Sequence, residues 1–424
     1  LDKRLISPIM DFSKGNGEVI KNFANAAVEM GFSKKRGKEA AISALKAQEQ
    51  FQKTLFERGQ ETLSKLKQSD NLGVVIISRS YMSQDSGANL GVAEKLAELG
   101  VIPIPLDFLP LDTVDTGLFS DRPYWAYESK FIAATSIITK NPQLYGLALT
   151  NFGCGPDSFI IKVLEDISGT NPLGQLETDE HAAEAGLVTR LEAFVDTIKE
   201  HARVTTKDQA VCSKTIYRGT SARIKQSKKL LIPNMSPHAK ILCASMQVCG
   251  VDAQVLPEPN ETDLLYASEV TSGTECLPYR VTLGGFLRYF KENPGDTEVQ
   301  GFMSGSYGPC RLGKYAIEQE KLLKEAGYEM PMCTTVSNHA YRDLNLGPGF
   351  ERMAWKGIVA VDHLEKLLWR CRPYTDKPET ANKLFDKTLT TLADHIARGS
   401  DYADYIRQAT IDFNNLVNPD VPRK

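Results

Sequence analysis

Three cysteines of this 424-residue chain lie in short segments rich in Gly, Pro and small polar residues. Cys154 is in T-N-F-G-C-G-P-D, Cys276 in T-S-G-T-E-C-L-P and Cys310 in S-G-S-Y-G-P-C-R-L-G. A thiolate is a good metal ligand, and backbone amides beside glycine can approach a bound group closely. Three thiols from three separate turns therefore predict a metal or cluster site. Three glycines of these turns complete the predicted cofactor-binding set: Gly153, Gly155 and Gly308.

The ordinary alternative is that these are three buried thiols, because free cysteine is among the most buried residue types. The residue pattern alone leaves both interpretations open. If the ligand is a metal, three thiolates favour an iron–sulfur cluster over structural zinc. Structural zinc needs a closed set of four ligands, whereas a cubane held by three cysteines leaves one iron open. The sequence has no C-x-x-C pair, which also weighs against a zinc ribbon.

Candidate acid–base residues lie near these turns. Glu275 directly precedes Cys276, and the consecutive residues Asp179, Glu180 and His181 precede a helical pattern. Glu275 and His181 are the predicted catalytic residues, since a positioned carboxyl or imidazole can transfer a proton. The alternative for the acidic residues is a structural role in the first turn of a helix, where the helix dipole favours negative charge. For Glu275 it is a hydrogen bond acceptor beside the thiol.

The segments around the cysteines indicate how they are positioned. The turns of Cys154 and Cys310 follow apolar runs typical of buried strands, Leu144–Leu149 and Val299–Met303. All three turns precede a stretch that can start a helix. A thiol at the carboxyl end of a strand lies where an open α/β sheet binds ligands. The positive end of the following helix favours a thiolate and an anionic guest.

The rest of the chain alternates between strand and helix patterns. The β-branched run Gly73–Ser78 is typical of a strand buried on both faces, and a helix over Leu90–Leu99 and a strand over Val101–Pro105 complete a βαβ unit. A second unit begins with the strand Leu230–Ile232 and the helix Pro237–Val248. We therefore predict an α/β fold with two Rossmann-like parallel-sheet domains, flanked by N- and C-terminal helical segments.

Four segments follow from this pattern. They are an N-terminal helical segment at 1–70, a first Rossmann-like domain at 71–204 with Cys154, a second at 205–340 with Cys276 and Cys310, and a C-terminal helical region at 341–424. Thr178 is the expected N-cap of the helix over Leu187–His201. Neither domain has a G-x-G-x-x-G or P-loop motif, so an ordinary dinucleotide or ATP site is not predicted.

Composition excludes several classes of function. The net charge of −3 gives no indication of nucleic-acid or anionic-membrane binding. No apolar run approaches the roughly 20 residues that span a bilayer, and the first residues lack a signal-peptide pattern. Eight cysteines in a chain of this length are not a disulfide scaffold, so a reducing cytoplasm is the expected location. The first residue is Leu1, which is compatible with a piece of a longer protein.

Four long segments resemble one family. They are T-N-F-G-C-G-P-D-S-F at Thr150–Phe159, D-E-H-A-A-E-A-G at Asp179–Gly186, T-S-G-T-E-C-L-P-Y at Thr271–Tyr279 and G-P-C-R-L-G-K-Y at Gly308–Tyr315. The chain is similar over nearly its whole length to the family of 2-hydroxyacyl-CoA dehydratases and their ATP-dependent activators, the CoA-substrate-specific enzyme activases.

The resemblance implies a [4Fe-4S] cluster. In the dehydratases, subunits built of Rossmann-like domains hold such a cluster by three cysteines, and the separation of Cys276 and Cys310 is similar to that of the first two ligands. The third ligand comes later in those chains, whereas Cys154 comes earlier here, which is a departure from the pattern. The longer family members also have an ASKHA-type activator ATPase and a further cysteine-bearing region, absent from this sequence. The chain thus resembles the carboxy-terminal, electron-accepting half.

The implied reaction begins when a partner activator, an ASKHA-type iron–sulfur ATPase, hydrolyses ATP and transfers one low-potential electron. The cluster held by Cys154, Cys276 and Cys310 would receive it and bind a 2-hydroxyacyl-CoA thioester at its open iron. Reduction of the thioester carbonyl would expel hydroxide, with a proton from Glu275 or His181. A second cluster-bearing subunit, or a second copy of the chain, is a further expected partner.

Three alternatives remain open from the sequence. One is a double-cubane-type reductase of small molecules. Another is a non-catalytic electron-transfer or scaffold subunit, in which the cluster would lie near the surface without a substrate pocket. The last is a Rossmann-like binding module without a cluster.

Overall fold

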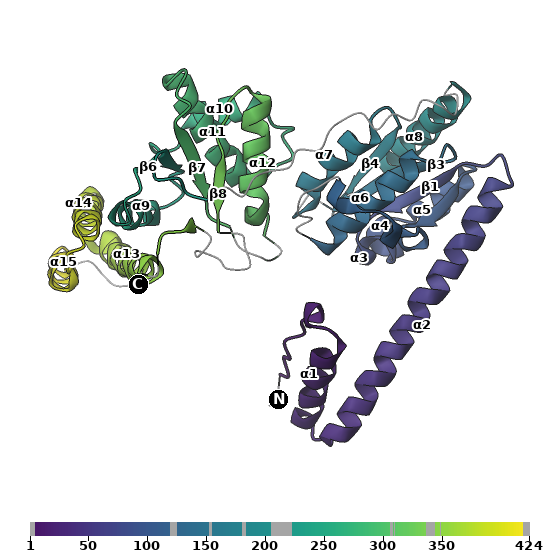
Figure 1. Ribbon diagram of the computed structural model, residues 1–424, viewed down its shortest axis with the longest axis horizontal. Helices are drawn as coiled ribbons and strands as arrows, with labels where there is room; N and C mark the ends of the chain where they lie inside the picture. Colours follow the sequence, from purple (N-terminus) through teal and green to yellow (C-terminus); the bar gives the residue numbers. More distant parts are fainter. Residues whose placement is uncertain are drawn as a thin grey trace. The chain divides into compact units, whose positions relative to one another are not determined.

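The computed structural model describes residues 5–118, 125–151, 155–179, 184–204, 223–305, 308, 310–335, 344–347 and 349–418. Two four-stranded parallel sheets and many helices confirm the predicted α/β class with two Rossmann-like sheets (Figure 1). The chain forms two compact units. The first contains Leu1–Asp115, Lys130–Asn151 and Ile167–Ser213, and the second contains Thr116–Ser129, Phe152–Asp166 and Lys214–Lys424. The four segments predicted from the sequence stay a prediction.

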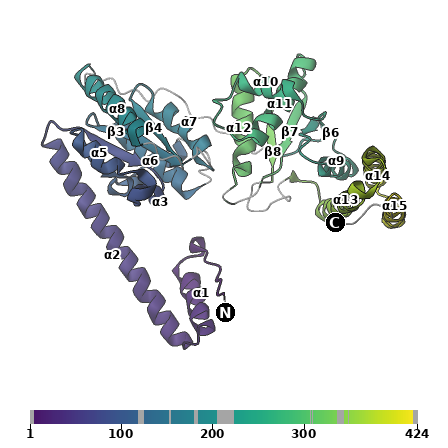
Figure 2. The same ribbon diagram turned by 180° about the vertical axis from the view of Figure 1, so that it is seen from behind.

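The N-terminal helices form a hairpin. A short 3-10 helix, η1 (Phe12–Lys14), precedes α1 (Asn16–Glu29), which lies beside the first part of the long helix α2 (Lys34–Lys67), as Figures 1 and 2 show. Gly37 permits this approach, because a Cβ there would lie 2.7 Å from the Cβ of Ala27. Ser33 caps α2 by accepting a hydrogen bond from the Arg36 amide at 3.3 Å.

The first sheet has the strand order β2-β1-β3-β4, all parallel. Its strands are β1 (Gly73–Ile77), β2 (Ile102–Pro105), β3 (Leu144–Asn151) and β4 (Leu173–Thr178). The helices among these segments are α3 (Ser80–Ser83), α4 (Ser86–Asn89), α5 (Val92–Glu98), η2 (Leu106–Phe108), η3 (Leu111–Thr113), η4 (Thr116–Leu118), α6 (Ala126–Thr139), α7 (Asp157–Ser168) and α8 (Glu184–Val204).

One local prediction in this region is wrong. Thr178 is not a helix N-cap but the last residue of β4, a strand that the apolar pattern does not predict. β4 lies at the edge of the sheet and alternates buried and exposed residues. Its sequence L-G-Q-L-E-T is therefore less apolar than the fully buried strand β1.

The second sheet repeats the order of the first, as β6-β5-β7-β8. Its strands are β5 (Lys229–Ile232), β6 (Ala253–Val255), β7 (Val299–Met303) and β8 (Met332–Thr334), and its helices are α9 (His238–Val248), α10 (Glu261–Ser268), α11 (Leu277–Glu292) and α12 (Leu312–Glu325). In this order the winding reverses between β5 and β7, where open α/β sheets form a ligand-binding crevice at the carboxyl ends of the strands.

The C-terminal region is helical, with α13 (Phe350–Cys371), η6 (Arg372–Tyr374), α14 (Pro378–Ala397) and α15 (Ala403–Asn415). These helices share an apolar core with α9. Gly357 of α13 allows close packing, since a Cβ there would lie 2.4 Å from Cγ2 of Ile241. Among the helices that the structure describes, none is both long and apolar enough to cross a membrane.

Candidate functional site

Cys276 is the N-cap residue of α11, a helix of 16 residues in the second unit. Its carbonyl accepts hydrogen bonds from the amides of Tyr279 and Arg280 at 3.0 and 3.2 Å. Pro278 fits the first turn of the helix, where no backbone N–H is required. The sequence E-C-L-P thus places a half-buried thiol at the positive end of a helix.

The Cys276 thiol contacts a tyrosine of the next helix. Its Sγ lies 2.5 Å from Oη of Tyr315, which is in the first turn of α12 and only 4% exposed. The Tyr315 ring packs with those of Tyr279 and Phe159, at centroid distances of 5.1 and 6.1 Å. Burial raises the pKa of Tyr315 above its ordinary value, and the hydrogen bond with Cys276 adds to this effect. The phenol is therefore protonated and can donate.

Cys310 lies in the connection between β7 and α12 and is exposed. The next residue, Arg311, is the N-cap of α12. A negative charge on either thiol would raise the pKa of Tyr315 further, after burial and the hydrogen bond, whereas the Arg311 charge lowers it. The structure thus places Cys276 and Cys310, two of the three predicted ligands, at the starts of α11 and α12, and Cys276 contacts α12 through Tyr315.

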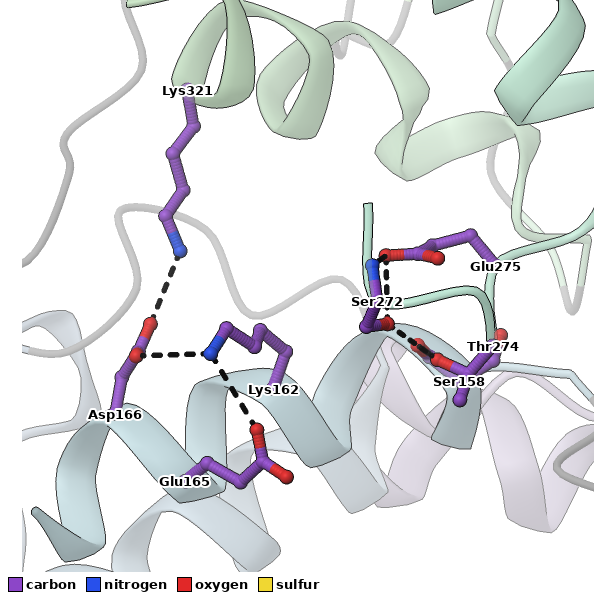
Figure 3. Close-up of polar contacts among 8 residues, drawn as sticks. All are labelled: Ser158, Lys162, Glu165, Asp166, Ser272, Thr274, Glu275 and Lys321. Atoms are coloured by element: carbon purple, nitrogen blue, oxygen red, sulfur yellow. Dashed lines mark hydrogen bonds and ion pairs between the residues drawn. The ribbon is translucent and has the colours of Figure 1, made fainter. Parts of the chain in front are cut away.

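The first turn of α7, within the second unit, is tied to both cysteine turns. Nη1 of Arg311 donates to Oγ of Ser158 at 3.0 Å, and Oγ1 of Thr274 donates to the Ser158 carbonyl at 3.2 Å. Figure 3 shows Ser158 beside Thr274. Ser158 comes four residues after Cys154. Cys154 and Gly153 lie outside the described residues, so both stay predictions.

The two other predicted glycines have backbone conformations that favour glycine. The φ angles are +64° for Gly155 and +151° for Gly308. The Gly308 carbonyl accepts a hydrogen bond from Nε1 of Trp125 at 3.1 Å. The conformations explain the residue type, and the role of both glycines in cofactor binding stays a prediction.

The Glu275 carboxylate folds back onto its own loop. It accepts hydrogen bonds from the Ser272 amide at 3.1 Å, the Ser272 hydroxyl at 2.9 Å and the Gly273 amide at 2.9 Å, as Figure 3 shows in part. These bonds fix the turn that precedes Cys276. The catalytic role of Glu275 stays a prediction, as does that of His181, which lies with Glu180 outside the described residues.

Ion pairs hold the start of α12 and the body of α7 in place within the second unit. Lys314, next to Tyr315, forms a buried ion pair with Glu128. Lys321 contacts Asp166 at 3.3 Å, and Asp166 also lies 3.7 Å from Lys162 (Figure 3). A buried pair is weak evidence for stability, because desolvation offsets much of the attraction. Its effect here is to fix the helix that carries Tyr315.

The remaining described thiols are core or packing residues. Burial raises the pKa of Cys243 to about 11 and that of Cys333 to about 12. Cys371 is buried at the end of α13. These three thiols are in the environments of ordinary buried cysteines rather than of ligands.

Sequence reasoning missed three residues of this site: Tyr315, Arg311 and Ser158. Tyr315 and Arg311 lie in the segment G-P-C-R-L-G-K-Y together with Cys310. A tyrosine in the first turn of the helix that follows a cysteine turn was an available signal. Its contact with Cys276 depends on the packing of α12 beside α11, which the linear sequence does not show.

Comparison with known proteins supports one part of the predicted identity. Residues 1–109 match the model of a family described as CoA enzyme activase uncharacterised domain (DUF2229). The match covers the helical hairpin, β1 and β2. It shows similarity to an activase-related family over this part of the chain. No curated protein and no solved structure matches the sequence.

Proposed function

We propose that this chain is the iron–sulfur component of an ATP-activated reductase or dehydratase system. It would accept a low-potential electron from an activator ATPase and reduce a bound 2-hydroxyacyl-CoA thioester, from which water is eliminated. The observation that carries the proposal is the placement of Cys276 and Cys310 at the starts of α11 and α12, with Cys276 in contact with Tyr315 of α12. The activase-related match over residues 1–109 supports the same class of system.

The chemistry of the donor set fits an anionic cluster. Both thiols lie at helix N-termini, whose dipoles and free amides compensate negative charge. Within the described residues, no His, Asp or Glu completes a metal-binding group around Cys276 and Cys310. A third thiol from Cys154, outside those residues, is the proposed remaining ligand.

Each described residue of the site has a proposed task. A [4Fe-4S] cluster bound there would supply one-electron transfer and an iron with an open coordination position. Cys276, Cys310 and Cys154 would bind it. Tyr315 holds a proton at Oη, directed at Cys276 Sγ, and Arg311 adds a positive charge fixed by its hydrogen bond to Ser158.

The departing hydroxide requires a proton, for which Glu275 and His181 are the proposed sources. The Ser272 and Gly273 hydrogen bonds hold the Glu275 carboxylate beside the Cys276 turn. To donate a proton, Glu275 would have to be protonated and exchange one of these bonds for a contact with substrate. His181 is the alternative donor.

The exposure of Cys310 favours a second candidate function. A cluster reached by solvent on one side also suits a relay subunit that passes electrons to another protein without binding a thioester itself.

The first test is the iron and acid-labile sulfide content of the chain after strictly anaerobic purification. We expect about four of each per chain, lost in Cys154→Ala, Cys276→Ala and Cys310→Ala. Cys249→Ala is the matched control, because Cys249 is a half-buried thiol at the end of α9. Folded protein that stays free of iron after anaerobic reconstitution would overturn the proposal and leave a binding module.

A second test separates the two candidate functions. The cluster-loaded chain is mixed with an activator ATPase, ATP and a 2-hydroxyacyl-CoA. A dehydratase component consumes the thioester after reduction, whereas a relay is reduced and leaves the thioester unchanged.

A further inference from the structure

When Cys276 is a metal ligand, the donor and the acceptor of its hydrogen bond with Tyr315 are fixed. A ligating sulfur has no proton, so only the Tyr315 hydroxyl can donate in the 2.5 Å contact. The hydroxyl has little freedom to turn to solvent, because Tyr315 is 4% exposed and its ring packs against those of Tyr279 and Phe159. The hydrogen bond is therefore built into the packing of α12 against α11.

We propose that Tyr315 is a positioning residue that raises the reduction potential of the bound cluster through its hydrogen bond to Cys276. The inference rests on the proposed function, because it requires Cys276 to be a cluster ligand. Reduction adds one negative charge, which is shared with the ligand sulfurs. A hydrogen bond strengthens as its acceptor becomes more negative. It therefore stabilises the reduced state more than the oxidised state, which makes the potential less negative.

The surroundings of the two described ligands differ. Cys276 is half-buried and has a donor fixed by aromatic packing, whereas Cys310 is exposed. The Arg311 guanidinium next to Cys310 donates to Ser158. Among the described residues, Tyr315 is thus the side chain that donates a hydrogen bond to a candidate ligand sulfur. Removing its hydroxyl removes this one interaction.

Tyr279 provides a matched control in the same aromatic cluster. It is the same residue type, it is fully buried, and its ring centroid is 5.1 Å from that of Tyr315. Within the described residues its hydroxyl has no hydrogen bond partner. Tyr279→Phe therefore makes the same chemical change close to the thiols without removing a hydrogen bond to sulfur.

The experiment compares the wild-type chain, Tyr315→Phe and Tyr279→Phe, each reconstituted anaerobically. Iron content is measured first, and the midpoint potential is then obtained by redox titration followed by electron paramagnetic resonance. We expect unchanged iron in all three. In Tyr315→Phe we expect about a tenfold smaller reduction equilibrium constant, which corresponds to about 59 mV more negative for a one-electron couple. We expect no shift in Tyr279→Phe.

The outcomes separate this inference from the proposed function. Iron in Tyr315→Phe with an unchanged potential would overturn the inference alone, and so would an equal shift in Tyr279→Phe. Iron-free wild-type protein would overturn both. If Tyr315→Phe loses its iron, the midpoint potential of a chain with 3-fluorotyrosine at position 315 tests the inference instead. Fluorotyrosine keeps the ring and makes the hydroxyl a stronger donor, so the potential must become less negative, and an unchanged potential would overturn the inference.

Discussion

The buried hydroxyl of Tyr279 lowers the free energy of unfolding of the protein. Burial raises its pKa well above the ordinary value, and within the described residues the oxygen has no partner. We expect Tyr279→Phe to raise the free energy of unfolding by about 1 kcal/mol, because an unsatisfied buried hydroxyl is removed while the ring remains. Urea unfolding followed by circular dichroism measures the change.

Tyr289→Phe is the control for this prediction. The Tyr289 hydroxyl donates to Oδ2 of Asp296 at 2.7 Å, so its loss is expected to lower the free energy of unfolding by about 1 kcal/mol. A loss of stability in Tyr279→Phe equal to that in Tyr289→Phe would mean that the Tyr279 hydroxyl has a partner in the folded protein.

At the residue scale, the sequence predicted that Cys276 and Cys310 lie in turns at the starts of helices. It did not predict which side chains surround them. Their Gly- and Pro-containing segments are local signals of turns at helix starts. The Tyr315 contact joins residues 39 positions apart, and no local pattern encodes it. Glu275 adjoins Cys276 in the sequence, which predicts a catalytic role, yet the turn directs its carboxylate to Ser272 and Gly273.

At the element scale, the packing of α10 against α11 depends on one glycine. A Cβ at Gly284 would lie 1.9 Å from the carbonyl oxygen of Asp263, so the two helices must separate in Gly284→Ala. We expect this variant to lose about 1–3 kcal/mol of unfolding free energy, measured by urea unfolding. Because Cys276 is the N-cap residue of α11, iron retention should fall as well.

Gly285→Ala tests whether this cost is steric. A Cβ at Gly285 would meet only Cδ1 of Leu256, at the ordinary contact distance of 3.5 Å. The higher helix propensity of alanine then makes this variant equal to wild type or up to about 1 kcal/mol more stable. Similar losses in Gly284→Ala and Gly285→Ala would contradict the packing argument.

The elements differ in how well their sequences predicted them. The strands β1, β3 and β7 are buried along nearly their whole length and are mostly apolar, although Gln300 interrupts the apolar residues of β7. The edge strand β4 was missed because one of its faces is exposed. The short helix α10 was also missed, although Asn260 and Asp263 form a capping box at its start.

At the scale of the whole molecule, the fold class was predictable because strand and helix periods are local properties of the sequence. The division into compact units is not local. The segment Phe152–Asp166 belongs to the second unit. There Ser158 bonds Thr274 across 116 positions and Asp166 contacts Lys321 across 155. Such pairings follow from tertiary packing, which the spacing of residues along the chain does not encode.

Two buried thiols of the second unit make the stability of the folded molecule depend on pH. The pKa of Cys333 is raised by burial from 9.0 to about 12, and that of Cys243 to about 11. Above about pH 9 the unfolded chain loses these protons while the folded chain keeps them. The stability present below that pH is therefore lost as the pH rises toward the folded pKa values, at about 1.4 kcal/mol per pH unit for each thiol.

Unfolding in urea at several pH values between about 8 and 11, under reducing anaerobic conditions, measures this slope. In Cys333→Ala we expect a lower stability at pH 8, since a buried sulfur is removed, and a shallower decline toward pH 11. Met332→Ala in the same strand makes the control, because it removes a buried sulfur without removing an ionisable group and should leave the slope of the wild-type chain unchanged. Equal slopes in Cys333→Ala and wild type would show that Cys333 ionises as readily in the folded molecule as in the unfolded chain, contrary to its complete burial in β8.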